Sequence, residues 1–257
     1  MVYNRGMSLK WIIDASLFPL SSSVSLEDEM IIRKIRDSAV FCFFGHGNPE
    51  TASRLANEYH KLNLKDEQIL TLPQAAALVL RNQDPQKRRV QFFGSKFMKE
   101  AFRKAGFEES MAPDYVIFAD PVHASIDELS DLLYLVEHGT QIVSLSGCLK
   151  YRRDEMNVLA AGAVVRMLEE VTGISAIHLD SFANAFVPAL TMMRREKSNL
   201  DKIIVSGQPE NVLAPAAQAG MKTILVSSAM APDTDLFGLP VHPDWIIQNF
   251  HDLSAAL

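Results

Sequence analysis

The sequence is poor in cysteine and has no long apolar run, and each shortage argues against a class of protein. Only two cysteines occur among its 257 residues, Cys42 and Cys148, and each lies in or beside an apolar run. We therefore expect no disulfide framework and a reducing compartment, the cytoplasm. No stretch reaches the roughly 20 apolar residues of a membrane helix, and no secretory signal is expected near the N-terminus. A membrane partner is not expected.

Basic charge is also scarce. The chain has 25 Lys and Arg against 31 Asp and Glu, which gives a formal net charge of -6. Proteins that bind nucleic acid usually present a basic surface, so a nucleic-acid partner is not expected. Hydrophobic residues, in contrast, make up 48% of the chain, which is enough for a large packed core.

Short apolar runs alternate with segments of helical period along most of the chain. The predicted strands cover residues 11–14, 39–45, 89–94, 114–120, 141–147, 175–180, 202–207 and 222–228. The predicted helices cover residues 26–37, 49–62, 73–81, 96–105, 125–138, 157–172, 183–197 and 210–219. Apolar strands that alternate with helices are typical of parallel sheets built from β-α-β units. The sequence therefore predicts an α/β fold.

Polar residues and glycines stand where several of the predicted strands end. In open parallel sheets, ligands bind just beyond the carboxyl ends of the strands, so these positions are the candidates for a site. Asp14 is the first of them, a carboxylate directly after the apolar residues 11–13, and Ser16 follows two positions later. The candidates after later strands are Gly45, His46, Gly47, Asp180, Ser181, Ser206, Gly207 and Gln208.

Several of these candidates also have an ordinary structural interpretation. His46, between two glycines, can act as a base, a phosphate donor or a metal ligand, or it can be a polar loop residue that faces water. Asp180 can cap the helix that follows it. Lys150 and Arg152 lie in the charged segment 146–157. They can contact an anionic ligand or belong to a solvated loop.

Longer segments resemble, in the same order, class IIA of the haloacid dehalogenase superfamily, the branch of NagD and the para-nitrophenylphosphatases. They are FFGHGNPETASRLANEY (43–59), KAGFEESMAPDYVIFAD (104–120), AAGAVVRMLEEVTG (160–173) and KIIVSGQPENVLAPAAQAGMKTILVSS (202–228). The resemblance implies a Rossmann-like core, residues 1–82 and 176–257, with an inserted α/β cap domain, residues 83–175. The charged, turn-rich stretch 81–89 agrees with the first of these boundaries.

The resemblance also implies roles for the strand-end residues, because active members of the family are Mg-dependent phosphatases. Asp14 stands at the position of the nucleophile. The family's acid/base carboxylate is replaced by Ser16, and its phosphate-binding Thr-Asn pair by Gly45 and His46. The family's lysine is replaced by Ser181.

The magnesium position is altered as well. Gly207 replaces the first of the family's two magnesium-binding aspartates, and Asn211 or Val212 replaces the second. Glu210 is the one carboxylate left in that loop. Magnesium prefers a shell of carboxylates and water, and a phosphoryl group in transfer needs preorganised positive charge. We therefore predict no metal site and no cofactor, although active relatives use Mg.

The resulting prediction is a phosphatase-like protein with little or no Mg-dependent phosphatase activity and a binding or regulatory role. The predicted catalytic positions are Asp14, as a vestigial nucleophile, and His46. The predicted ligand-binding positions are Ser16, Gly45, Gly47, Lys150, Arg152, Ser181 and Gly207. Lys150 and Arg152 correspond to the family's substrate-specificity loop. A small phosphorylated metabolite is the expected partner, and a homodimer is compatible with the family's use of the cap in dimer contacts.

Two alternatives stay open from the sequence. The first is an active hydrolase in which Asp14 attacks a small phosphorylated or halogenated metabolite without a metal, as the superfamily's dehalogenases do. The second is an ordinary phosphatase whose missing groups come from Glu210, from His46 or from a partner chain. Turnover without metal favours the first alternative, and stabilisation by Mg together with turnover favours the second.

Overall fold

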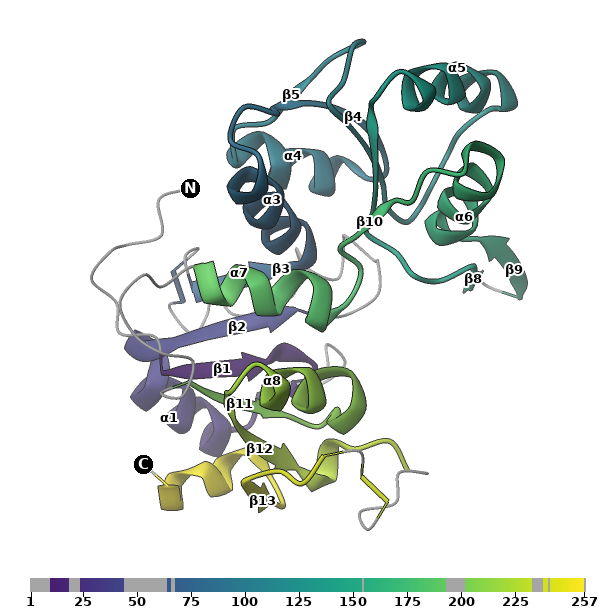
Figure 1. The fold of residues 1–257 in the computed structure, drawn as a ribbon. Coiled ribbons are helices and arrows are strands. Elements are labelled where there is room, and N and C mark those ends of the chain that lie inside the picture. The colour runs from purple at the N-terminus through teal and green to yellow at the C-terminus, as the bar shows by residue number, and fades with distance from the viewer. Residues whose placement is uncertain are drawn as a thin grey trace. The chain divides into compact units, whose positions relative to one another are not determined.

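The computed structural model describes residues 10–18, 24–43, 64–65, 68–153, 155–192, 202–232, 238–239 and 241–256. The chain divides into two compact units (Figure 1). The first contains the described residues of Met1–Gly45, Thr51–Thr71 and Phe186–Leu257, and the second those of Leu72–Ala185. Each unit is built on its own parallel sheet with helices against it, which confirms the predicted α/β class.

The first unit contains a six-stranded sheet in the order β13-β12-β11-β1-β2-β3. Its strands are β1 (Trp11–Asp14), β2 (Ala39–Phe43), β3 (Ile69–Thr71), β11 (Ile203–Ser206), β12 (Lys222–Val226) and β13 (Trp245–Ile247). Its helices are α1 (Leu26–Ile35), α7 (Val187–Met192) and α8 (Ala214–Gln218), with shorter helical turns at Ala15–Leu17, Arg36–Ser38, Pro209–Leu213, Ser227–Ala229 and Phe250–Ala256. The central strands β1 and β2 are buried along their whole length, as expected for strands covered on both faces.

The second unit contains a five-stranded parallel sheet in the order β10-β7-β6-β4-β5. Its strands are β4 (Arg89–Phe93), β5 (Glu108–Glu109), β6 (Tyr115–Phe118), β7 (Gln141–Ser144) and β10 (Ile177–His178). Its helices are α3 (Leu72–Gln83), α4 (Lys96–Lys104), α5 (Ile126–Glu137) and α6 (Ala161–Thr172). An antiparallel hairpin, β8 (Lys150–Arg153) with β9 (Met156–Leu159), extends from this unit, and a π-helical turn, Phe182–Phe186, crosses the boundary between the units.

Helix ends in the second unit show local and long-range capping side by side. Ser125 and Glu128 form a capping box at the start of α5, and Gly173 ends α6 with a positive φ of 69°, a conformation that favours glycine. The start of α6 has no local side-chain cap. There Asp120, from the loop after β6, accepts a 2.7 Å hydrogen bond from the backbone N–H of Ala161.

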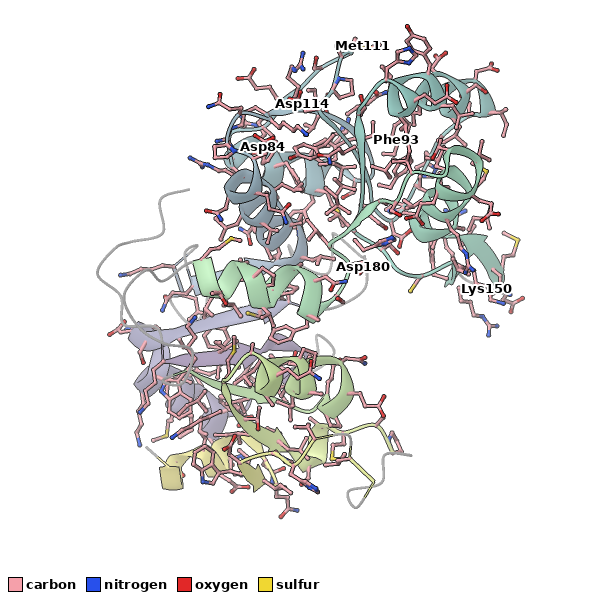
Figure 2. The ribbon with its side chains drawn as sticks, viewed as in Figure 1. Asp84, Phe93, Met111, Asp114, Lys150 and Asp180 are labelled. Carbon is pink, nitrogen blue, oxygen red and sulfur yellow. The ribbon has the colours of Figure 1, made fainter. Side chains whose placement is uncertain are left out.

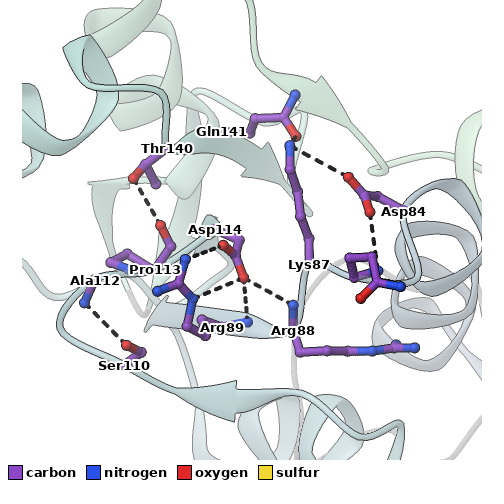
Figure 3. Close-up of polar contacts among 11 residues, drawn as sticks. Asp84, Lys87, Arg88, Arg89, Ser110, Ala112, Pro113, Asp114, Thr140 and Gln141 are labelled. Carbon is purple, nitrogen blue, oxygen red and sulfur yellow. Dashed lines mark hydrogen bonds and ion pairs between the residues drawn. The ribbon is translucent and has the colours of Figure 1, made fainter.

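The amino ends of three strands in the second unit are joined by the Asp114 network, defined by Asp114, Arg88, Arg89, Lys87 and Gln141 (Figure 3). The Asp114 carboxylate accepts bonds from the backbone N–H groups of Arg88 (3.0 Å) and Arg89 (2.8 Å) and from the Arg89 guanidinium (2.6 Å). Lys87 Nζ donates to Gln141 Oε1 at 3.0 Å. Hydrogen bonding to Arg89 holds the pKa of Asp114 below its ordinary value. These bonds tie the start of β4 to the starts of β6 and β7.

Several predicted element boundaries are wrong. Residues 157–159 belong to the hairpin strand β9, and α6 begins only at Ala161. The predicted strand 175–180 is reduced to Ile177–His178. Strands β3, β5 and β13 and the hairpin are not predicted at all. They are only two to four residues long, and such short runs carry little periodic signal.

The predicted domain boundaries, 82/83 and 175/176, stay a prediction. Two elements near them lie in the second unit: α3 falls within Leu72–Ala185, and β10 pairs with β7. The predicted helix 49–62 lies outside the described residues. Among the residues that are described, no helix is long and apolar enough to cross a membrane.

Candidate functional site

Asp14 and Ser206 stand at the carboxyl ends of the two central strands of the six-stranded sheet. β1 pairs with β11 on one side and with β2 on the other. β2 and β3, which follow β1 in the sequence, lie on one side of β1 in the sheet, and the later strands β11, β12 and β13 lie on the other side. The strand order therefore reverses between β1 and β11, and this is the switch point at which ligands bind in open α/β sheets.

The Asp14 side chain is the centre of a small polar cluster, which we call the Asp14 network: Asp14, Ser16, Ser206 and Gln208. Ser206 Oγ donates to Asp14 Oδ2 at 2.5 Å, and the backbone N–H of Ser16 donates to Oδ1 at 2.9 Å. Gln208 Nε2 donates to Asp14 Oδ2 at 3.3 Å and to Ser16 Oγ at 3.0 Å. Each of these donors is a neutral hydroxyl or amide.

Burial dominates the electrostatics of Asp14. Its exposed fraction is 0%. Burial raises the pKa of the Asp14 carboxyl above its ordinary value, and hydrogen bonds from Ser206, Ser16 and Gln208 lower it without cancelling that effect. The neighbouring thiol of Cys42, paired with Asp14 across β1 and β2, has a pKa raised well above its ordinary value by burial and by the Asp14 charge. A reactive thiolate is therefore not supported here.

Gly207 is held against the backbone of another segment. A Cβ atom built on Gly207 would lie 2.6 Å from the carbonyl oxygen of Ala229 and 2.7 Å from its Cβ. Both distances are shorter than real Cβ contacts, so any side chain at this position requires the Ala229 backbone to move. The glycine thus has a packing reason for its presence, and a carboxylate at this position does not fit the structure as it stands.

The other predicted positions do not add a charged group to the Asp14 network. Ser181 lies in the second unit, where its Oγ accepts a 3.2 Å bond from the backbone N–H of Asn184. Glu210 is exposed in the first turn of the helical segment Pro209–Leu213. Within the described part of the chain, no group of three or more His, Cys, Asp or Glu residues is placed to hold a metal ion.

Lys150 and Arg152 stand on the hairpin rather than on a loop. Arg152 is opposite Asn157 and Lys150 is opposite Leu159. Side chains two residues apart on a strand share a face, so the two cations point the same way, and both are exposed. Figure 2 shows Lys150 projecting from the second unit at the hairpin.

Gly45, His46 and Gly47 lie outside the described residues, so their predicted roles stay predictions. Ser206 and Gln208 are among the strand-end candidates of the sequence, but no role is predicted for either of them. The available signal is their position at the end of an apolar strand, in the stretch SGQPEN. Their approach to Asp14 depends on the pairing of β1 with β11, residues almost 200 positions apart.

Known proteins resemble this chain over most of its length. No protein-family model matches the sequence. The ribonucleotide monophosphatase NagD of Escherichia coli K12 is 24% identical over 209 residues, which are 80% of this chain and 81% of that protein.

Solved structures give the same result at the level of the fold. The p-nitrophenyl phosphatase from Archaeoglobus fulgidus matches with a TM-score of 0.76 and 16% identity, over 97% of this chain and 99% of that one. The 4-nitrophenylphosphatase from Thermotoga maritima matches with a TM-score of 0.74 and 18% identity, over 96% and 97%. NagD from E. coli K-12 matches with a TM-score of 0.72 and 22% identity, over 96% and 98%. This chain is homologous to NagD and has the NagD and p-nitrophenylphosphatase type of fold, class IIA of the haloacid dehalogenase superfamily.

Proposed function

We propose that this chain is a phosphatase-like protein with little or no Mg-dependent phosphatase activity, and that it acts by binding a small phosphorylated metabolite in a regulatory role. The observation that carries the proposal is the state of Asp14. Its carboxylate is fully buried, and hydroxyl and amide donors occupy both of its oxygens. A nucleophile must reach the phosphorus atom of its substrate, and a side chain with no exposed surface is not placed to do so.

The charge around Asp14 supports the same proposal. Phosphoryl transfer builds up negative charge that lysine, arginine or magnesium normally stabilises. Within the described residues, the bonds to Asp14 come from Ser16, Ser206 and Gln208, which are all neutral. Losing one such preorganised donor typically costs about 10²–10³ in rate.

The packing at Gly207 supports the absence of magnesium. The resemblance implies that active relatives carry a metal-binding aspartate at the position of Gly207, and in this chain Ala229 leaves no room for a side chain there. A single buried carboxylate such as Asp14, bonded to neutral donors, is a poor ligand for an ion that requires an octahedral shell.

Turnover assays test the proposal. The full chain is incubated with para-nitrophenyl phosphate and with ribonucleoside 5′-monophosphates, with Mg and with EDTA, beside E. coli NagD as the positive control. We expect release of phosphate no faster than from the Asp14→Asn variant under every condition. Mg-dependent turnover at the rate of the positive control, abolished by Asp14→Asn, would overturn the proposal.

A second candidate is a hydrolase that uses Asp14 without metal on a phosphorylated or halogenated metabolite. The position of Asp14 at the switch point between β1 and β11 favours it. Its signature is turnover of a phosphate ester or a 2-haloacid in EDTA that disappears in Asp14→Asn. A homodimer also stays a prediction, and it is checked by light scattering on the full chain.

A further inference from the structure

The hairpin of β8 and β9 is a sheet of only two strands, so each of them is an edge strand. It extends from the second unit (Figure 1), and its register pairs Lys150 with Leu159 and Arg153 with Met156. Within the part of the chain that the structure describes, no further strand pairs with either edge. Edge strands present backbone groups that another strand can join. The hairpin therefore offers two edges at which its sheet can be extended.

The hydrogen bonds of the hairpin show which backbone groups face outward. The N–H of Ala160 donates to the carbonyl of Leu149 at 3.1 Å, so these two residues form a hydrogen-bonded pair. Hydrogen-bonded and non-hydrogen-bonded pairs alternate along an antiparallel ladder. The next pair, Lys150 with Leu159, is therefore not hydrogen-bonded, and the same holds for Asn157 two residues further on. On β9, the backbone N–H and C=O groups of Asn157 and Leu159 thus point away from β8, toward the open edge.

The two edges differ in charge. β8 carries three basic residues, Lys150, Arg152 and Arg153, whereas β9 has the uncharged sequence MNVL. Charged side chains on an edge strand protect it against pairing with another chain, and β9 lacks this protection. Met156 and Leu159 on β9 are 65% and 70% exposed. The open edge of β9 therefore combines outward backbone groups with exposed apolar side chains.

A second copy of this chain fits the β9 edge when two β9 strands pair antiparallel about a two-fold axis at Val158. Asn157 of each copy is then opposite Leu159 of the other, and these are the residues whose backbone groups face outward. No like charges meet in this arrangement, because β9 is uncharged. The corresponding arrangement at β8 would place Lys150 of each copy opposite Arg152 of the other, and like charges directly opposite are destabilising. Self-pairing of the hairpin is therefore favoured at β9 and opposed at β8.

We propose that the open edge of β9 binds a second copy of this chain, in a four-stranded antiparallel sheet of the order β8-β9-β9-β8. The same register brings the exposed Glu155 of one copy toward Ala161 of the other, at the start of α6. The first turn of α6 has no acidic residue, and a carboxylate is favourable at a helix N-terminus. Four residues from each copy form a small interface, so the dimer is of the weak class that dissociates on dilution. This pairing gives the predicted homodimer a surface and is independent of any chemistry at Asp14.

Analytical ultracentrifugation of the full chain over a wide range of concentrations tests the proposal, with two double variants that differ only at position 159. Asn157→Lys with Leu159→Lys places lysine opposite lysine twice, and we expect the dissociation constant of the dimer to rise about tenfold. Asn157→Lys with Leu159→Glu places lysine opposite glutamate twice, and we expect the dimer to persist. The matched control is Leu26→Lys, at another exposed leucine, on α1 in the first unit, which should leave the association unchanged.

Four outcomes overturn the proposal: a wild-type chain that stays monomeric at every concentration, a lysine–lysine variant that associates like wild type, equal weakening in the two double variants, or the same weakening in Leu26→Lys. Equal weakening in the double variants would contradict an axis at Val158, since only that axis sets position 157 against position 159. Asn157 and Leu159 are exposed, so the variants are expected to fold, and their unfolding midpoints verify this beforehand. None of these measurements depends on turnover.

Discussion

Asp14 and Asp114 both stand at the end of a buried strand, yet their surroundings move their pKa values in opposite directions. Asp14 ends β1, is fully buried and accepts bonds from neutral groups, and burial raises its pKa. Asp114 is the residue directly before β6. Its side chain is 14% exposed and forms an ion pair with the guanidinium of Arg89. Hydrogen bonding to Arg89 lowers its pKa.

The two carboxylates differ both in burial and in their partners. Asp14 is fully buried, and hydrogen bonds from Ser206, Ser16 and Gln208 do not offset its loss of hydration. Asp114 is only partly buried, and there the hydrogen bond from Arg89 outweighs a smaller loss of hydration. A phosphoryl-transfer site needs cationic partners for the same reason. In this chain, Asp114 has a cationic partner and joins neighbouring strands, whereas Asp14, at the switch point, has only neutral partners among the described residues.

The largest effect is expected at the glycine beside the Asp14 network. Gly207→Ala places a Cβ against backbone atoms of Ala229, and we expect a loss of about 2–3 kcal/mol in the free energy of unfolding, measured by urea denaturation. The matched control is Gly147→Ala. Its Cβ would meet the end of the Asp180 side chain at 2.8 Å, which can rotate away. Equal losses in the two variants would contradict the close packing at Gly207.

The second-largest loss of stability is expected from a change in the Asp114 network. Asp114→Ala leaves the backbone N–H groups of Arg88 and Arg89 without their acceptor, and we expect a loss of about 2 kcal/mol. Asp114→Asn keeps an acceptor and costs less. Because the folded pKa is lowered, the contribution of Asp114 is present above the unfolded pKa of about 3.9 and is lost as pH falls through the folded pKa. Acid unfolding curves that match in wild type and Asp114→Asn would contradict this.

Asp14 is expected to give the opposite pH dependence. Its folded pKa is raised, so between the unfolded value of about 3.9 and the folded value the native state binds more protons, and stability falls as pH rises. In Asp14→Asn this component disappears. The free energy of unfolding of the variant relative to wild type therefore rises from pH ~4 to pH ~8, by about 1.4 kcal/mol per unit of pKa shift. A constant difference across that range would show that Asp14 has an ordinary pKa.

The smallest effect is expected from Gln208. Its bond to Asp14 is long, at 3.3 Å, and its bond to Ser16 is 3.0 Å, so Gln208→Ala should cost about 0.5–1 kcal/mol. Because the Gln208 bond lowers the pKa of Asp14, the variant should move the pH dependence attributed to Asp14 to higher pH. Asp14→Asn combined with Gln208→Ala should show no such movement. A shift that persists in the double variant would assign it to another group.

Much of the fold follows from the sequence because its central elements have strong patterns. Residues 11–14 and 39–43 are apolar runs, and both form buried strands of the predicted parallel sheet. Ser125 and Glu128 are spaced as a capping box, and α5 begins between them. The short strand β3 and the hairpin were beyond prediction, since three or four residues at the edge of a sheet carry no distinctive period.

The site was predictable only in part. The strand-end position and the resemblance make Asp14 a candidate from the sequence alone, and its role stays a prediction. Its partners Ser206 and Gln208 come from a strand that is almost 200 residues away and lies beside β1 only in the folded sheet. Lys150 and Arg152 were predicted on a loop, and the structure places them on the hairpin.

By itself, the sequence determined the α/β class and the strands that form the centre of the first sheet. The tertiary structure decided what surrounds Asp14, why Gly207 tolerates no side chain and which residue caps α6. The physical reason is that hydrophobic and helical patterns are local along the chain. Burial, hydrogen-bond partners and close contacts depend on segments that meet only after the strands have paired.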